Sequence, residues 1–201
     1  MNLKHENSLT DQDLIEKVLS GDNRAFTVII KKTERLVAQI VFKMIREPEE
    51  RKDIAQDVYL KVFKSLSSFK FQSKLSTWIA KITYNTCLKY LEKQKQQFFS
   101  YGNPETDDEA THSSNKAIMQ SDDDVESSIF QDELSAILKV EIEMLPTLYR
   151  TLITLYHNEE LSYSEIAQIT ELPEGTVKNY LFRARKALKE NLVQKFRRES
   201  L

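Results

Sequence analysis

The scarcity of glycine and proline restricts the possible folds of this chain more than any other feature. Its 201 residues include three glycines and four prolines, whereas average usage would give about 24 of the two together. Sheet sandwiches and barrels need turn residues every few positions, so they are excluded. The few breakers are widely spaced and leave long uninterrupted stretches: Gly21, Pro48, Gly102, Pro104, Pro146, Pro173 and Gly175. The chain is therefore expected to be all-α.

Apolar residues in most of those stretches recur at spacings of three and four, as on one face of a helix. We expect four helices in the N-terminal part: 11–20, a longer helix that Pro48 ends, 49–67 and 75–96. Four more are expected at 129–144, 146–157, about 162–170 and 175–196. Thr10 and Ser162 are suited to cap helices, and Ser162 forms a capping box pattern with Glu165. Pro146 suits the first position of its helix.

The stretch 98–128 has a different composition from the predicted helices. It is rich in Ser, Asn, Asp and Glu, contains Gly-Asn-Pro and lacks sustained periodicity, which is typical of a flexible linker. We assign Asp122–Asp124 to this linker and not to a metal site, because no other ligand converges there. The chain is thus predicted to hold two small helical domains, 10–97 and 129–198, joined by a flexible acidic linker over 98–128.

Charge is distributed unevenly, although the formal net charge is only −2. Residues 1–97 carry 18 Lys and Arg against 12 Asp and Glu, residues 98–146 carry 2 against 12, and residues 147–201 carry 9 against 7. The most basic segments are 61–97 and 174–198. Two basic segments that flank an acidic one suggest two contacts with a polyanion such as nucleic acid. Ordinary solvated helix faces would give the same pattern.

Enzyme, metal and membrane functions have little support in the sequence. A single cysteine, Cys87, excludes a disulfide framework and a multi-cysteine metal site, and the three histidines are scattered. Without a glycine-rich phosphate loop or a catalytic constellation, we expect no catalysis, no cofactor, no metal and no small-molecule substrate. The first residues lack an apolar signal-peptide core, and no run of about 18 apolar residues could span a membrane, so we expect a cytoplasmic protein.

Residues 162–190 have the form of a helix-turn-helix: a short capped helix, a turn at 171–174 and a longer basic helix. Val177 and Leu181 would face inward, and the opposite side would present Asn179, Phe182 and Lys186. An amide can pair with a base edge while cations hold the helix to phosphates. The start of the second helix of such a motif lies against the bases. A helical hairpin with a charged face would share this pattern.

Segments from both halves of the chain strengthen the nucleic-acid interpretation. GDNRAFTVIIKK (21–32), DIAQDVYLKVFKSL (53–66) and SFKFQSKLSTWIAKITYN (68–85) resemble the bacterial RNA polymerase sigma factors of the extracytoplasmic-function group. So does LPTLYRTLITLYHNEELSYSEIAQITELPEGTVKNYLFRARKAL (145–188). The order also matches: region 2, a linker and region 4, over about 14–96 and 129–190. The resemblance implies a promoter-specificity subunit that binds core RNA polymerase, recognises −10 and −35 elements and aids strand opening.

The resemblance also implies roles for particular residues. In the family the DIAQD segment binds the clamp helices of the polymerase β′ subunit, which points to Asp53, Gln56 and Asp57. Their i, i+3, i+4 spacing places them on one helix face, away from Ile54 and Val58.

Two further groups are implied to contact DNA. The loop 69–74 and the helix after it resemble the reader of the −10 element, where single-strand contacts are expected from Lys70, Phe71, Gln72, Ser73, Lys74, Trp78, Lys81 and Asn85. The last helix resembles the −35 reader, with contacts expected from Thr176, Lys178, Asn179, Phe182, Arg183 and Lys186. Trp78 also lies on the apolar stripe of its helix, so packing in the core is an alternative for it.

The implied partners are core RNA polymerase, through its β′ clamp helices and β flap, promoter DNA and an anti-sigma factor. Some residues depart from the family pattern. Glu171 stands where the family often has Gly, and a positive φ there would cost about 1 kcal/mol, which favours a different turn. Phe71 replaces a usual Gly, and Asn179-Tyr180 replaces a common Ser-Arg pair, so the promoter sequence stays open. The alternative function is an autonomous helix-turn-helix regulator that binds duplex DNA without polymerase.

Overall fold

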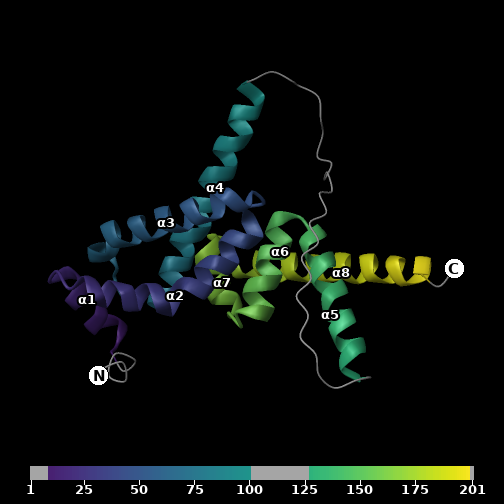
Figure 1. Cartoon of the computed structure of the whole chain (residues 1–201), viewed down its shortest axis with the longest axis horizontal. Helices are drawn as coiled ribbons and strands as arrows, with labels where there is room; N and C mark the ends of the chain where they lie inside the picture. The colour runs from purple at the N-terminus through teal and green to yellow at the C-terminus, as the bar shows by residue number, and fades with distance from the viewer. Residues whose placement is uncertain (1–8, 101–126, 200–201) are drawn as a thin grey trace.

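The computed structural model describes residues 9–100 and 127–199, and the described residues form helices joined by short turns (Figure 1). The all-α prediction is therefore confirmed. In chain order the helices are α1 (Asp11–Leu19), α2 (Asn23–Met44), α3 (Pro48–Ser65), a 3₁₀ turn η2 (Leu66–Ser68), α4 (Leu75–Ser100), α5 (Ser127–Met144), α6 (Thr147–Ile153), a π turn η3 (Thr154–Asn158), α7 (Tyr163–Thr170) and α8 (Glu174–Glu199).

Several helix starts are fixed by the side chains that the sequence singles out. Thr10 caps α1 in a reciprocal box with Asp13, and Ser162 caps α7 in the same way with Glu165. Each box satisfies backbone N–H groups that a helix start leaves without partners. Asp22 caps α2 by accepting a hydrogen bond from the Arg24 N–H at 2.9 Å.

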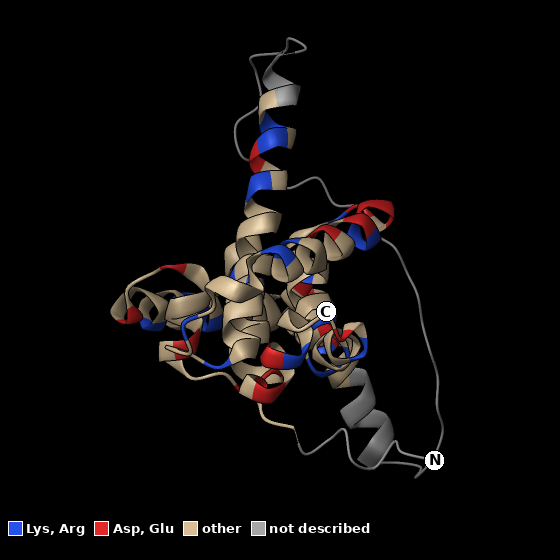
Figure 2. Ribbon diagram, turned by 90° about the vertical axis from the view of Figure 1, so that its left-hand side faces the viewer, with Lys and Arg blue, Asp and Glu red and all other residues tan. Residues whose placement is uncertain are grey.

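In the N-terminal part of the chain, α1 packs on α2, and α4 lies against both α2 and α3. Their shared core includes Leu14, Ile29, Val58 and Ile79, all almost completely buried. The second half of α4 projects away from this body (Figure 1). Figure 2 shows lysines along the projecting part. The interruption of its apolar stripe at Lys89 and Lys93 accounts for the exposure of these turns.

The C-terminal helices form a second packed unit, in which α8 lies against α6 and α7. Val177, Leu181 and Ala184 of α8 are fully buried, as the predicted inward stripe requires. Ile166 and Ile169 of α7 are also fully buried. The residues predicted to form a helix-turn-helix therefore do so, with α7 and α8 as its two helices.

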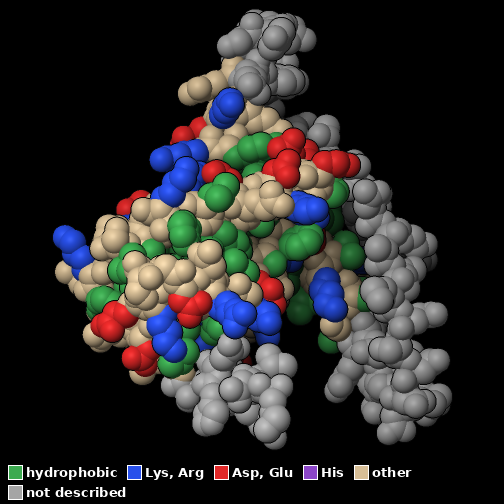
Figure 3. Space-filling view, turned by 60° about the vertical axis from the view of Figure 1, so that its left-hand side comes forward, with side chains coloured by type: hydrophobic (Ala, Val, Ile, Leu, Met, Phe, Trp, Pro, Cys, Tyr) green, Lys and Arg blue, Asp and Glu red, His purple; other side chains and the backbone are tan. Residues whose placement is uncertain are grey.

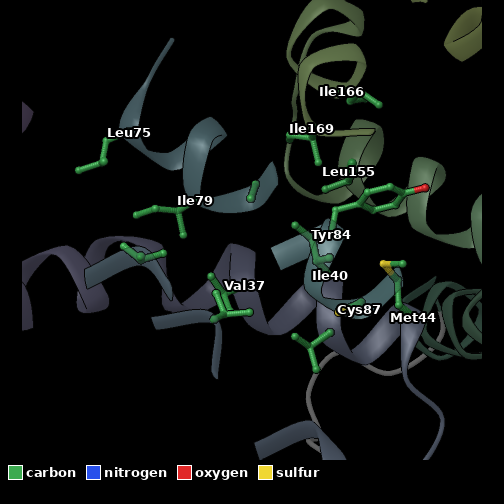
Figure 4. Close-up of a cluster of buried hydrophobic side chains, with 14 of the residues drawn as sticks. Val37, Ile40, Met44, Leu75, Ile79, Tyr84, Cys87, Leu155, Ile166 and Ile169 are labelled. Atoms are coloured by element: carbon green, nitrogen blue, oxygen red, sulfur yellow. The ribbon is translucent and has the colours of Figure 1, made fainter. Parts of the chain in front are cut away.

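The two units pack against each other: α7 lies on α4, and α6 lies on α2. Figure 4 shows Tyr84 of α4 beside Leu155 of η3 and Ile169 of α7, with Ile40 and Met44 of α2 close by. These residues belong to one continuous cluster of buried side chains. The apolar core is therefore shared between the two halves of the chain.

Arg150 of α6 also joins the two halves, at the ends of two helices. Its buried guanidinium donates through Nε to the Lys43 carbonyl at 2.5 Å and through Nη1 to the Glu143 carbonyl at 3.2 Å. A further hydrogen bond runs from Nη2 to Thr147 Oγ1 at 3.3 Å. Both carbonyls lie in the last turns of α2 and α5, where a helix lacks internal donors and a cation is favourable. Burial lowers the pKa of Arg150 from its usual value.

Several predicted boundaries differ from the structure. Pro146 is the N-cap of α6 and not its first residue, with φ −49° and ψ 144°. The helix expected at 146–157 changes to a π turn after Ile153. The helices α4 and α5 reach Ser100 and Ser127, into the stretch predicted as linker, while 101–126 lies outside the described residues. Leu134 and Leu138, apolar residues of the helix expected at 129–144, are exposed, because α5 contacts α6 and α8 chiefly through its later turns.

Candidate nucleic-acid interface

The loop before α4 presents an aromatic side chain to solvent through an unusual backbone conformation. Phe71 has φ 54° and remains half exposed, and its ring lies 4.9 Å from that of buried Phe69. The ring of Trp78, on the first turn of α4, lies 5.2 Å from the ring of Phe69. Trp78 is partly buried against the core. Lys70 and Gln72 are exposed beside this cluster, and Ser73 is half-buried.

The polar side chains along α4 contact the C-terminal unit. Lys74 Nζ lies 2.8 Å from Glu165 Oε1, and Lys81 Nζ lies 2.8 Å from Glu171 Oε1. Asn85 Nδ2 donates to Glu171 Oε2 at 3.3 Å. Three of the residues predicted to contact the −10 element are thus held by two carboxylates of α7 and the turn after it.

Glu165 and Glu171 place negative charge beside the basic segment 61–97. Among the side chains coloured in Figure 3, Lys and Arg lie next to Asp and Glu, with hydrophobic side chains between them. The face drawn in Figure 3 therefore presents mixed charge. Opening of the contact between α4 and α7 would expose Lys74 and Lys81 without their carboxylates.

Glu165 carries the largest resolved shift among these carboxyls. The Lys74 ammonium, together with the N–H and hydroxyl of Ser162, lowers the pKa of Glu165 from 4.5 to about 2. Glu165 Oε2 accepts from the Ser162 N–H at 3.0 Å and from the Ser162 hydroxyl at 2.8 Å. The same side chain therefore closes the capping box of α7 and binds α4. Lys81 and Asn85 likewise lower the pKa of Glu171.

We expect acid to weaken the fold through Glu165. A carboxyl whose pKa is lower in the folded chain stabilises that state fully above its ordinary pKa of 4.5, and the contribution is lost as the pH falls towards 2. Solvent screening limits the effect to about 1 kcal/mol. Thermal unfolding of wild type and Glu165→Gln between pH 7 and pH 2 tests this, because glutamine preserves the capping box. The gap in stability should close below pH 4.5, and a constant gap would contradict this role.

The second helix of the helix-turn-helix presents the predicted −35 residues to solvent. Lys178, Asn179, Phe182, Arg183 and Lys186 are exposed, and Phe182 is 68% exposed. Thr176 is half-buried at the helix start. In addition, Lys178 lies 2.8 Å from Glu174, and Lys186 lies 3.9 Å from Glu190, each within the helix. Exposed pairs of this kind are weak and leave the cations available to phosphates.

Two departures from the resembled family pattern have structural explanations. Glu171 adopts the left-handed conformation, with φ 58° and ψ 26°, so the expectation of a different turn is wrong. The contacts of its carboxylate with Lys81 and Asn85 offset the strain. Tyr180 is half-buried, with its ring 6.0 Å from Tyr149. Of the pair Asn179-Tyr180, only Asn179 faces solvent.

A third group lies on α3, away from both of these faces. Asp53, Gln56 and Asp57 are exposed, while the adjacent residues Ile54 and Val58 are buried. Asp57 pairs with Lys61, one turn along the helix, at 2.6 Å. The same face continues through two exposed apolar residues, Leu60 and Phe63, which are 58% and 46% exposed. Neither residue is among those predicted from the sequence, although Leu60 follows Asp57 by three positions and Phe63 follows Leu60 by three, which places both on that face.

The described residues hold no group of three or more His, Cys, Asp or Glu side chains that could bind a metal ion. Within the same part of the chain, no helix combines the length and apolarity needed to cross a bilayer. Cys87 is buried, and burial raises the pKa of its thiol to about 12. A thiol with that pKa is a poor nucleophile and metal ligand near neutral pH.

Two family models match the chain in separate segments. Sigma-70 region 2 matches residues 29–97, and sigma-70 region 4 matches residues 135–188. Among curated relatives, the RNA polymerase sigma-H factor of Pseudomonas aeruginosa is 30% identical over 185 residues, which are 90% of this chain and 93% of the relative. The ECF RNA polymerase sigma-E factor of Escherichia coli is 34% identical over 189 residues, which are 92% and 95% of the two chains.

Solved structures share the same fold. CnrH, in complex with the cytosolic domain of CnrY, is 18% identical with a TM-score of 0.60, and the match covers 92% of this chain and 97% of CnrH. The sigma factor RpoE of Bartonella quintana, solved with the anti-sigma factor NepR, is 21% identical with a TM-score of 0.61. That match covers 83% of this chain and 96% of RpoE.

Proposed function

Because this chain belongs to the sigma-70 family, in its extracytoplasmic-function (ECF) group, we propose that one of its three exposed residue groups binds core polymerase and that the other two recognise the promoter. Members of this family direct RNA polymerase to promoters, and this chain does the same. Two matching regions in the family order carry this conclusion. The autonomous regulator is not favoured, because it leaves the region 2 match without a role. Acting by binding alone, the protein needs no catalytic residue.

The face of α3 is the proposed contact with core polymerase. Asp53, Gln56 and Asp57 offer carboxylates and an amide to a protein surface, and Leu60 and Phe63 extend the face with apolar area. Polar groups beside exposed apolar side chains are a combination suited to a protein interface. The β′ clamp helices are the partner that we propose for this face, and the β flap is the partner proposed for the C-terminal domain.

The loop before α4 and the exposed side of α4 form the proposed −10 reader. Phe71, held outward, offers a ring on which an unstacked base can lie. Lys70, Lys74 and Lys81 supply cations for the phosphates of a single strand, and Gln72, Ser73 and Asn85 supply hydrogen bonds. Trp78 packs on Phe69 and remains partly exposed. We therefore propose that it supports this surface and that its exposed part contacts DNA.

The exposed side of α8 is the proposed −35 reader. Asn179 and Phe182 lie one turn apart near the helix start, where a helix-turn-helix meets the base edges. Asparagine is suited to adenine, and an aromatic side chain to the methyl group of thymine. Thr176, Lys178, Arg183 and Lys186 surround them and are proposed to hold the phosphates.

Substitutions on α8 are expected to separate base reading from phosphate binding. Asn179→Ala should change the preferred −35 sequence, with a loss of about tenfold on the matched site and little loss on a mismatched one. Lys186→Ala should weaken binding to all sequences and reduce the salt dependence by about one phosphate contact. Holoenzyme binding to a set of −35 variants over a range of salt measures both effects. Equal losses on matched and mismatched sites for Asn179→Ala would contradict its role.

An anti-sigma factor is the regulator that we propose for this protein. Support comes from the family and from the RpoE neighbour solved with NepR. Pull-down of cellular proteins with the whole chain, followed by inhibition of transcription with the purified candidate, tests the proposal. Capture of core polymerase subunits alone would count against such a regulator.

A further inference from the structure

The contact between α4 and the C-terminal unit engages the residues assigned to the −10 element. Lys74 meets Glu165, and Lys81 and Asn85 meet Glu171. Lys74 immediately precedes α4, and Lys81 and Asn85 follow it at spacings of seven and four, so the three residues lie along one side of the start of α4. Carboxylate oxygens occupy the positions in which these cations and this amide would otherwise meet phosphate oxygens.

The position of Glu171 provides independent support for a built contact. Its backbone is left-handed, a conformation that is unfavourable for a side chain with a Cβ and that glycine adopts freely. Glycine would form the same turn without strain, but it would supply no carboxylate. The carboxylate of Glu171 binds two residues of α4. The strained turn therefore presents a charge to the N-terminal domain.

Glu165 is held in place by the capping box of its own helix. Its Oε2 is fixed by the N–H and hydroxyl of Ser162 in the capping box, so that Oε1 faces Lys74. An apolar contact between α4 and α7 includes Tyr84, Ile166 and Ile169 (Figure 4). This apolar contact sets the spacing at which the two carboxylates meet α4.

We propose that Glu165 and Glu171 form a carboxylate latch that occupies the phosphate-binding side of α4, so that the free protein is closed and a single DNA strand must displace α7 to bind. The inference rests on the −10 role proposed for α4. Because the DNA strand and α7 compete for the same side chains, DNA binding and separation of the two domains are thermodynamically linked. The latch therefore reduces promoter-strand binding by the protein before it joins polymerase.

The first test measures affinity for a fluorescein-labelled single strand of mixed A and T at low salt, using the whole chain. The double variant Glu165→Gln, Glu171→Gln should bind the strand about tenfold more tightly than wild type. The substitutions remove two exposed ion pairs that compete with DNA for Lys74 and Lys81. Glutamine keeps the capping box of α7. A second variant, Glu171→Gly, keeps the left-handed turn and should also bind more tightly.

Glu174→Gln is the matched control for loss of charge. Glu174 lies in the same unit and is about as exposed as Glu171, but its partner is Lys178 of its own helix. A variant at Glu174 should therefore leave binding of the single strand within about twofold of wild type. An equal gain from Glu174→Gln would show a general effect of net charge and would overturn the latch.

The second test measures domain separation without DNA. Spin labels at Lys64→Cys in α3 and Lys189→Cys in α8 occupy exposed positions, and buried Cys87 with a pKa of about 12 remains unlabelled near neutral pH. Wild type should give one narrow distance distribution, and the double glutamine variant a broader one with a different mean. Unchanged distances in that variant would overturn the latch.

A third variant distinguishes failure of the latch from failure of the −10 role. Lys74→Ala with Lys81→Ala removes cations that both the latch and the DNA would use. If this variant loses affinity for the strand while the glutamine variant gains none, α4 binds DNA and the latch is wrong. If it retains full affinity, the −10 role of these lysines is wrong, and the latch as a barrier to DNA is wrong with it.

Discussion

Replacing Asp53, Gln56 and Asp57 together by alanine is expected to weaken binding to core RNA polymerase by about 100-fold. A hot-spot residue at the centre of an interface costs about 1 kcal/mol or more when truncated, and a loss of about 1 kcal/mol at each of the three positions compounds to about this factor. The three side chains project from one exposed face of α3. Competition with a labelled housekeeping sigma factor for purified core enzyme measures the effect.

The same variant should fold normally. Alanine is a strong helix former, and the exposed ion pair that the substitution breaks, between Asp57 and Lys61, stabilises the fold little. As a control, Glu16→Ala with Glu34→Ala removes two exposed carboxylates from α1 and α2 of the same domain. Core binding at wild-type strength by the triple variant, or an equal loss in the control, would remove α3 from the proposed interface.

Arg150→Ala is expected to lower the free energy of unfolding by about 3 kcal/mol. The substitution removes hydrogen bonds from a charged group and leaves the Lys43 and Glu143 carbonyls without that donor in a buried place. It also removes the link between α6 and the end of α2. Denaturant unfolding, followed by circular dichroism, measures the loss.

Arg35→Ala is the matched control for Arg150. Arg35 of α2 also reaches the C-terminal unit, through Glu159 at 3.2 Å and the Asn158 carbonyl at 3.2 Å. Its side chain is 74% exposed, so its loss should cost less than about 1 kcal/mol. Similar losses of unfolding free energy in the two variants would contradict the claim that burial strengthens the contribution of Arg150 to stability.

Local signals in the sequence predicted most of the fold. The capping boxes at Thr10 and Ser162, the buried stripe of α8 and the solvent-facing group around Asn179 depend on residues within a few positions of one another, and sequence spacing reports such relations directly. The same holds for Asp53, Gln56 and Asp57 on α3. The position of Pro146 differed by one residue, because both the N-cap and the first helical position accept its fixed φ.

Contacts between distant segments could not be predicted in the same way. The strain at Glu171 was expected to change the turn, but Lys81 and Asn85, which lie more than eighty positions earlier in the chain, stabilise the left-handed form. The carbonyls that Arg150 binds also belong to helices that meet only in the folded chain. The exposure of Leu134 and Leu138 follows from the position of α5 against its neighbours, which helical periodicity does not report.

Binding of the whole chain to core RNA polymerase, in competition with a housekeeping sigma factor, tests the central claim most directly. We predict that the protein displaces the competitor and that core enzyme carrying it recognises promoters that the chain alone does not bind specifically. No displacement, together with specific binding of the chain alone to duplex DNA, would contradict this account and support an autonomous regulator.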